Sequence, residues 1–274
     1  MSSFELLLST RNKKSEKDLD LFKKGIFSNC LIVNQVSENV LYSETLYQNN
    51  IKMVTYKGAG LSLNRNTSLK VSCAEIVLIT DDDVMMVSGY ETIITDSFKK
   101  YPNADIIIFK ASTFNDLDFR NSYPKSNKFL SLIELYSVSS IEIAFRRKKV
   151  LQKDIWFNES FGLGSKYESG EELLFLTEAK KKGLNILFLP HTIVKHPVFS
   201  SGYKFDNRLF FSKGALLFAL YGSFSYLLLL LFCFKKKIQF YKSVRLFDAI
   251  RFSYLGARDF QINRDVSFNS NAGL

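Results

Sequence analysis

Short apolar runs rich in β-branched residues alternate with longer amphipathic stretches over the first two thirds of this 274-residue chain. The short runs are typical of strands buried on both faces, and the longer stretches have the periodicity of helices. We expect strands at 4–9, 30–33, 51–55, 75–80, 104–109, 141–147 and 185–189. Helices are expected at 15–24, 61–72, 89–101 and 170–183. The alternation predicts an α/β fold: a doubly wound, mixed but mostly parallel sheet with helices on both faces.

Three consecutive aspartates, Asp81, Asp82 and Asp83, follow the apolar run 75–80. Doubly wound sheets bind ligands at the carboxyl ends of their strands, which is where the triplet is expected. Adjacent carboxylates repel one another unless a cation neutralises them, and hard oxygen ligands select Mg²⁺ or Mn²⁺, which also bind phosphate oxygens. The triplet therefore indicates a metal site for a phosphorylated ligand. A solvated turn with an acidic helix start would explain the same residues.

Two further acids, Glu171 and Glu172, begin an expected helix after the glycine-rich segment 161–164. A carboxylate at this position could act as a general base over a pocket built from loops. Acidic residues at a helix start also stabilise the helix dipole without any catalytic role. His196 follows an expected strand, where an imidazole could complete a metal shell or be structural.

Together these segments resemble the family 2 glycosyltransferases of the GT-A fold, of the kind that assemble bacterial polysaccharides, over residues 4–197 and more weakly to 260. The motifs that carry the resemblance are Ser-Thr-Arg-Asn at 9–12, Gly-Leu-Ser-Leu-Asn-Arg-Asn at 60–66, Asp-Asp-Asp at 81–83, Phe-Asn-Glu-Ser-Phe-Gly-Leu-Gly at 157–164, Gly-Glu-Glu at 170–172 and Val-Lys-His-Pro at 194–197. The resemblance implies an inverting enzyme that moves a sugar from a nucleotide-sugar donor to a saccharide or lipid-linked saccharide. Capsule or lipopolysaccharide synthesis is the implied setting.

The resemblance also assigns roles to individual residues. Asp83 is expected to be the main ligand of Mn²⁺ or Mg²⁺, with Asp81 reaching the donor ribose or the water shell of the metal. Glu172, or Glu171 in a shifted register, is expected to take the proton from the acceptor hydroxyl. The other implied contacts are Thr10, Arg11 and Asp82 to the donor, Arg65 near its diphosphate or fixing the nucleotide loop, and His196 at the metal.

Two positions depart from the family pattern. Many members carry an aspartate after the second strand that contacts the nucleotide base, and this chain has Asn34-Gln35 there. The amide of Asn34 can still hydrogen-bond an imide edge, so donor binding is expected to persist while the identity of the base is open. Many members also have aspartate at the position of Glu172, whose extra methylene shifts the carboxylate by roughly 1 Å.

The last part of the chain differs in composition, so we divide it into a catalytic domain at 1–201 and a C-terminal segment at 202–274. Residues 215–234 carry no charge, Lys235, Lys236 and Lys237 follow at once, and the segment holds 11 Lys and Arg against 4 Asp and Glu. Twenty apolar residues could cross a bilayer, but the basic residues after them favour a helix in or on the cytoplasmic leaflet, followed by a basic amphipathic helix at 244–255. A buried core helix or a homodimer interface is the alternative.

Net charge and cysteine content indicate the binding partners and the cellular location to expect. The net charge of +10 is concentrated beside the apolar segment, which favours a membrane surface over nucleic acid. Three cysteines without paired spacing, and a start without a basic n-region, favour the cytoplasmic face of the membrane. The alternatives are a nucleotidyltransferase acting on sugar phosphates, disfavoured because the basic segment 9–14 has no glycine, and a non-catalytic carbohydrate-binding relative.

Overall fold

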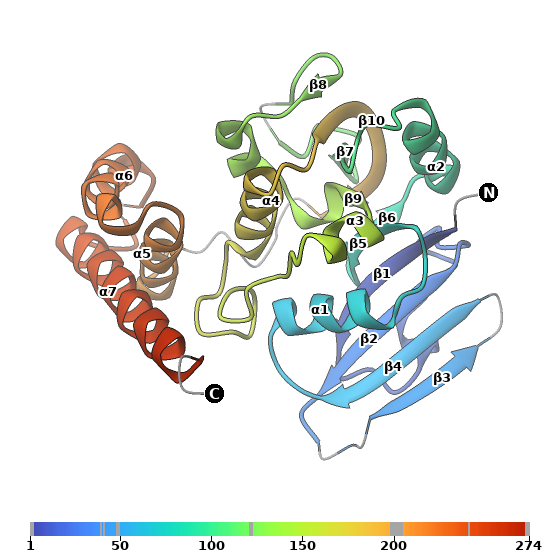
Figure 1. The fold of residues 1–274 in the computed structure, drawn as a ribbon, viewed down its shortest axis with the longest axis horizontal. Helices are drawn as coiled ribbons and strands as arrows, with labels where there is room; N and C mark the ends of the chain where they lie inside the picture. Colours follow the sequence, from blue (N-terminus) through green and yellow to red (C-terminus); the bar gives the residue numbers. More distant parts are fainter. Residues whose placement is uncertain are drawn as a thin grey trace.

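The computed structural model describes residues 3–38, 40, 42–47, 50–120, 123–197, 205–240 and 242–271, and only the backbone from 264 on. Its strands are β1 (Phe4–Arg11), β2 (Cys30–Val36), β3 (Ser43–Tyr47), β4 (Ile51–Lys57), β5 (Ile76–Asp81), β6 (Met85–Met86), β7 (Ile106–Thr113), β8 (Lys128–Phe129), β9 (Ile143–Arg146) and β10 (Ile186–His196). Within the described residues they form one sheet in the order β3-β4-β2-β1-β5-β9-β7-β10-β6, with β8 paired to β10 (Figure 1).

The central strands β4, β2, β1 and β5 run parallel, as do β7 and β10. Strand β9 lies antiparallel between β5 and β7. In this register Ser9 near the end of β1 is the neighbour of Asp81 at the end of β5, so the carboxyl ends of the two strands meet. The predicted mixed, mostly parallel sheet is confirmed, and it brings the aspartates to the predicted edge.

Helices cover both faces of this sheet. They are α1 (Leu61–Val71), α2 (Tyr90–Lys100), α3 (Arg147–Gln152) and α4 (Glu171–Lys181), followed by the C-terminal α5 (Asn207–Tyr221), α6 (Ser225–Phe240) and α7 (Leu246–Asn271). Successive residues of β1 point to opposite faces: Leu7 packs in the core that includes α1 and α4, and Leu6 and Leu8 pack in the core that includes α2. The doubly wound arrangement is thereby confirmed.

Two local predictions were wrong. The helix expected at 15–24 is only a 3₁₀ turn, Glu16–Leu19, which ends at Asp20 in the left-handed conformation with φ 50°. Asp18 accepts a hydrogen bond from the backbone N–H of Lys14 at 2.8 Å, which stabilises the start of the turn and does not extend it. Strand β3 was missed because its side chains are exposed apart from the partly buried Tyr47, so it has no apolar periodicity.

The apolar segment also differs from the prediction. Residues 215–234 do not form one helix, because Gly222 (φ 55°, ψ −141°) ends α5 and a 3₁₀ turn leads into α6. By length and composition alone, the stretch Asn207–Phe240 could still cross a membrane, and 28% of its most apolar window is buried. The expected basic helix at 244–255 is the first half of the longer α7. The expected domain boundary at Gly202 lies outside the described residues.

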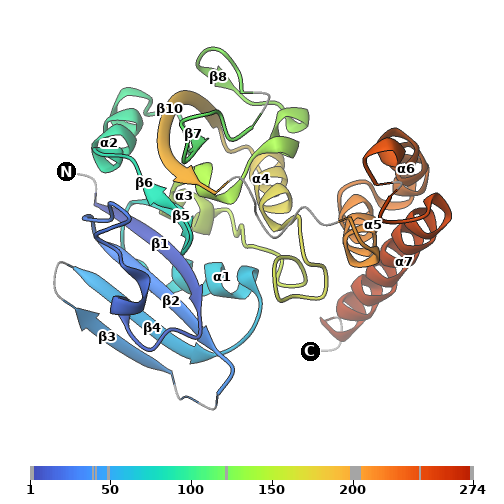
Figure 2. The same ribbon diagram turned by 180° about the vertical axis from the view of Figure 1, so that it is seen from behind.

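Helix α5 lies between α4 and the outer helices α6 and α7 in both views (Figures 1 and 2). Its contact with α7 is close: a Cβ added to Gly214 would lie 1.8 Å from the carbonyl oxygen of Ser253, so only glycine fits there. On its other side, Ala215 and Leu216 belong to the same core cluster as α4 and the sheet. Helix α5 and the α/β sheet therefore share a hydrophobic core, against which Phe260 of α7 also packs.

Candidate active site

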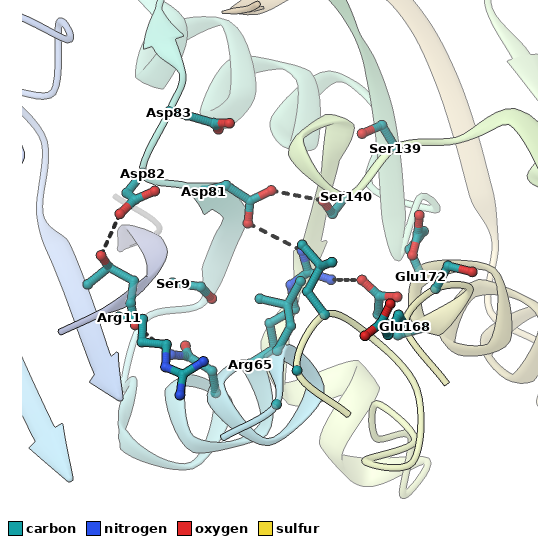
Figure 3. A pocket seen from close by; sticks show the side chains of 18 of the residues that line it. Ser9, Arg11, Arg65, Asp81, Asp82, Asp83, Ser139, Ser140, Glu168 and Glu172 are labelled. Carbon is teal, nitrogen blue, oxygen red and sulfur yellow. Dashed lines mark hydrogen bonds and ion pairs between the residues drawn. The ribbon is translucent and has the colours of Figure 1, made fainter. Parts of the chain in front are cut away.

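A cavity of about 560 Å³ opens at the carboxyl ends of β1 and β5 (Figure 3). Its walls come from the end of β1, the start of α1, the end of β5, the start of α4 and the end of β10. Nine of the site residues expected from the sequence line it: Thr10, Arg11, Arg65, Asp81, Asp82, Asp83, Glu171, Glu172 and His196. The fold thus brings together residues that are up to 186 positions apart in the chain.

Asn34 is the exception, because it does not line the cavity. Its side chain is fully buried and binds the backbone of Lys13, accepting from the N–H at 3.0 Å and donating to the carbonyl at 2.8 Å. The adjacent Gln35 lines the cavity instead, and its amide donates to the carbonyl of Gly60 at 3.1 Å. Asn34 therefore holds the segment after β1, and its expected contact with the donor stays a prediction.

Arg65 of α1 joins the two acidic parts of the site. Its guanidinium is 2% exposed and pairs with Glu171 at 3.0 Å and with Asp81 at 3.4 Å. A buried charge requires a partner of opposite charge, and here one guanidinium partly neutralises both carboxylates. Both terminal nitrogens of Arg65 bind carboxylates, so it positions Asp81 and Glu171, and its expected place near a diphosphate or the nucleotide loop stays a prediction.

The three aspartates of the triplet have different surroundings (Figure 3). Asp82 turns toward β1, where it accepts a hydrogen bond from Thr10 Oγ1 at 2.6 Å and lies 3.6 Å from Lys13 Nζ. Asp81 turns the other way, toward Arg65, and burial raises the pKa of its carboxyl while Arg65 opposes that shift. Asp83 stays the most solvent-accessible of the three, with a side chain 55% exposed. Protein cations therefore partner two of the carboxylates and leave Asp83 open.

His196 at the end of β10 faces Asp83. Its Nδ1 lies 2.7 Å from the carbonyl oxygen of Pro197, and since a carbonyl can only accept, Nδ1 carries the proton. The other ring nitrogen, Nε2, lies 3.5 Å from Asp83 Oδ1. One imidazole nitrogen and one carboxylate, both of types that bind metal ions, thus face each other. Among the described residues no three His, Cys, Asp or Glu side chains gather closely enough to hold a metal alone.

Glu172 lies across the cavity at the start of α4. Its Oε2 is buried without a hydrogen-bond partner. Burial and the neighbouring Glu171 carboxylate raise the pKa of Glu172 to about 8, against an ordinary value of 4.5, and Arg65 opposes the shift. A carboxyl group with a pKa near neutrality and a free oxygen is suited to accept a proton.

The loop 161–170 that leads into α4 is held by the C-terminal helices. The Tyr167 hydroxyl donates to Asp259 Oδ2 of α7 at 2.6 Å. The backbone N–H of Glu168 donates to Ser212 Oγ of α5 at 2.9 Å. The sequence did not single out Ser212 or Asp259, because a hydroxyl or an acid in an apolar helical segment forms no pattern that indicates contact with a distant loop.

Helix α5 also packs beside the start of α4, where Glu171 and Glu172 lie. A Cβ added to Gly170 would lie 2.6 Å from Leu216 Cδ2, so α5 packs against the residue that precedes α4. Burial lowers the pKa of Lys213 on the same helix, and the charges of Glu172 and Glu171 oppose that shift. The C-terminal segment therefore forms part of the electrostatic surroundings of Glu172.

No family model and no curated protein matches this chain. Solved structures of TarS from S. aureus do match. Residues 1–349 of TarS superpose with a TM-score of 0.59 at 15% identity, covering 94% of this chain and 83% of that one. The same part of TarS in complex with UDP-GlcNAc gives 0.59 at 15% identity and coverages of 89% and 76%, and its complex with UDP gives 0.59 at 18% identity with the same coverages. Across most of its length, this chain has the fold of the glycosyltransferase TarS.

Proposed function

We propose that this protein transfers a sugar, with inversion, from a nucleotide-sugar donor to a hydroxyl of a saccharide or lipid-linked saccharide. The observation that carries the proposal is one cavity in which the acidic end of β5 and Glu172 face each other, joined through the chain Asp81–Arg65–Glu171. One wall is suited to a phosphorylated donor and the other to a proton acceptor. The fold shared with TarS, which has been solved with UDP-GlcNAc and with UDP, supports the same reading.

In the proposed reaction Glu172 takes the proton of the acceptor hydroxyl. The acceptor oxygen forms a bond to the anomeric carbon as the bond from that carbon to the diphosphate oxygen breaks, and the nucleoside diphosphate leaves with the electron pair. A single displacement of this kind inverts the configuration. The raised pKa of Glu172 suits the role, because a base with a pKa near 8 is strong enough to assist the attack.

The donor and a divalent cation are assigned to the opposite wall. Asp83 Oδ1 and His196 Nε2 would hold Mn²⁺ or Mg²⁺, with donor phosphate oxygens and water completing the shell, since Mg²⁺ sites commonly use only one or two carboxylates. When bound, the cation would neutralise the charge of the leaving diphosphate. Thr10 and Arg11 at the end of β1, with Asp81 and Asp82, would line the path of the nucleotide.

Release of nucleoside diphosphate tests the proposal. A panel of nucleotide sugars, including UDP-GlcNAc, is first screened by calorimetry with Mn²⁺ and with EDTA, and donors that bind are incubated with saccharide and lipid-linked acceptors. We expect metal-dependent binding and acceptor-dependent release of nucleoside diphosphate. Release of pyrophosphate from a nucleoside triphosphate would instead identify a nucleotidyltransferase, and sugar binding without any turnover a carbohydrate-binding protein.

Variants of α4 separate a catalytic role from a structural one. Glu172→Gln should keep donor affinity and lose turnover by about 10²-fold or more. Glu178→Gln is the matched control, because Glu178 lies on the same helix and pairs on the surface with Lys182. Loss of turnover in Glu171→Gln alone would move the base by one residue, and full activity in both variants would refute the assignment.

A further inference from the structure

Helix α6 has two faces of opposite character. Its inner face consists of Ser225, Leu229, Cys233 and Phe240, all of them buried. Its outer face carries five large apolar side chains that are 42% to 84% exposed: Leu227, Leu230, Leu231, Phe234 and Ile238. Their spacing of three or four residues places them in one arc, opposite the buried residues. The helix therefore exposes a continuous apolar stripe, which we call the α6 stripe.

Basic residues border this stripe. At about 100° per residue, Lys235 and Lys237 lie on opposite edges of the arc, where their stems can cover apolar surface while their ammonium groups stay in water. Residues 207–247 carry seven Lys and Arg and no Asp or Glu. An apolar stripe flanked by cations is complementary to the acyl boundary and the anionic headgroups of a lipid surface.

The length and setting of α6 favour a helix that lies on the membrane over one that crosses it. Its 16 residues span about 24 Å, less than the hydrocarbon core of roughly 30 Å, and lysines occupy positions 235–237. The preceding α5 is unavailable for a crossing, because Ala215 and Leu216 pack in the protein core. Helix α5 also separates α6 from α4, so the stripe belongs to the part of the molecule away from the catalytic cavity (Figures 1 and 2).

We propose that the α6 stripe docks this protein, parallel to the surface, on a bilayer containing anionic lipid. The surface adds a location to the proposed function and does not depend on it, since docking requires no turnover. The stripe would enter the headgroup region while Lys235 and Lys237 pair with lipid phosphates. A second copy of the chain is the competing partner for the stripe, and the experiment separates the two.

The protein is sedimented with vesicles of phosphatidylcholine alone or mixed with phosphatidylglycerol. We expect it to pellet with the anionic vesicles, and more weakly as salt increases. The variant Leu227→Ser/Leu231→Ser/Phe234→Ser should lose at least ten-fold in partitioning. Lys235→Gln/Lys237→Gln should lose about 30-fold on anionic vesicles, from roughly 1 kcal/mol per lysine near such a surface.

The matched control replaces three apolar side chains of comparable exposure elsewhere. Phe27→Ser/Leu46→Ser/Ile133→Ser changes residues that are 70% to 82% exposed on the α/β part and should pellet like the parent. In addition, Leu231→Trp should show a blue shift on anionic vesicles that the parent, with Trp156 alone, does not show.

Three results would overturn the proposal. The parent could remain in the supernatant with every vesicle. The stripe variant could pellet as well as the parent. Light scattering could also show a dimer that the stripe variant converts to a monomer, without lipid binding in either, which would make the stripe an interface between two copies.

Discussion

Replacing Glu172 by glutamine should stabilise the folded protein at alkaline pH while it removes catalysis. The carboxyl of Glu172 is buried beside Glu171, and its pKa is about 8 when folded against an ordinary 4.5. Between these two pH values the folded chain holds a proton that the unfolded chain has released. Raising the pH therefore favours unfolding, and the stability associated with protonated Glu172 is lost as the pH rises through about 8.

The magnitude follows from the same pKa values. Between the unfolded and folded pKa values of Glu172, each rise of one pH unit lowers the free energy of unfolding by about 1.4 kcal/mol. From pH 6 to pH 9 the ionisation of Glu172 should therefore cost the parent about 3 kcal/mol of stability. Glutamine has the same shape and no charge to release, so Glu172→Gln should not share this loss. The difference between parent and variant reports the titration of Glu172 together with its coupling to Glu171, because the other titrating groups are common to both.

The measurement is urea unfolding of both proteins at pH 6 and pH 9 in EDTA, with Glu178→Gln as control. For the parent, kcat/KM should also rise from pH 6 to 8 and then level off, since only ionised Glu172 can accept a proton. A change of less than about 0.5 kcal/mol over this range in the stability difference between parent and Glu172→Gln would show that the carboxyl is solvated, and would contradict its raised pKa.

Three further predictions concern other residues that line the cavity. Arg65→Met should lower the free energy of unfolding by about 3–5 kcal/mol, since it leaves two carboxylates without their shared cation; a loss under 1 kcal/mol in urea titrations would contradict this. Asp83→Asn should fold normally and lose the Mn²⁺-dependent part of donor affinity in calorimetry, and unchanged affinity would remove Asp83 from the metal site. Gly170→Ala should lower Tm, because φ is +103° and the new Cβ meets Leu216. In a double-mutant cycle, Leu216→Ala should offset at least about 1 kcal/mol of that loss, and strict additivity would show that the contact is absent.

The fold and most of the site lining could be predicted because they depend on local patterns. A buried strand followed by Asp81, Asp82 and Asp83 predicts a ligand-binding edge without any knowledge of the surrounding fold. The structure places the triplet at that edge. Glu172 was predicted as a site residue for the same reason, from a glycine-rich loop before an acidic helix start, and it lines the same cavity.

The partners of these residues could not be predicted, because tertiary packing chooses them. Nothing near Arg65 in the chain indicates that Glu171, 106 positions later, would bind its guanidinium. Asn34 and Gln35 are chemically alike, and only the register of β2 decides which of them faces the cavity. The end of α5 at Gly222 could not be predicted from the uncharged run 215–234, since one glycine in an apolar pattern is compatible with a continuous helix.

The bond from Tyr167 to Asp259 has a consequence for the order in which a ribosome delivers this chain. Every residue assigned to the reaction has been synthesised once His196 has emerged, but the helices that hold the loop 161–170 come later, with α7 last. Because contacts so distant in sequence form only once both partners are available, Glu171 and Glu172 acquire these surroundings only after α7 has been synthesised. A nascent chain that stops before α7 therefore contains every residue assigned to the proposed reaction but lacks Asp259, which binds the loop through Tyr167.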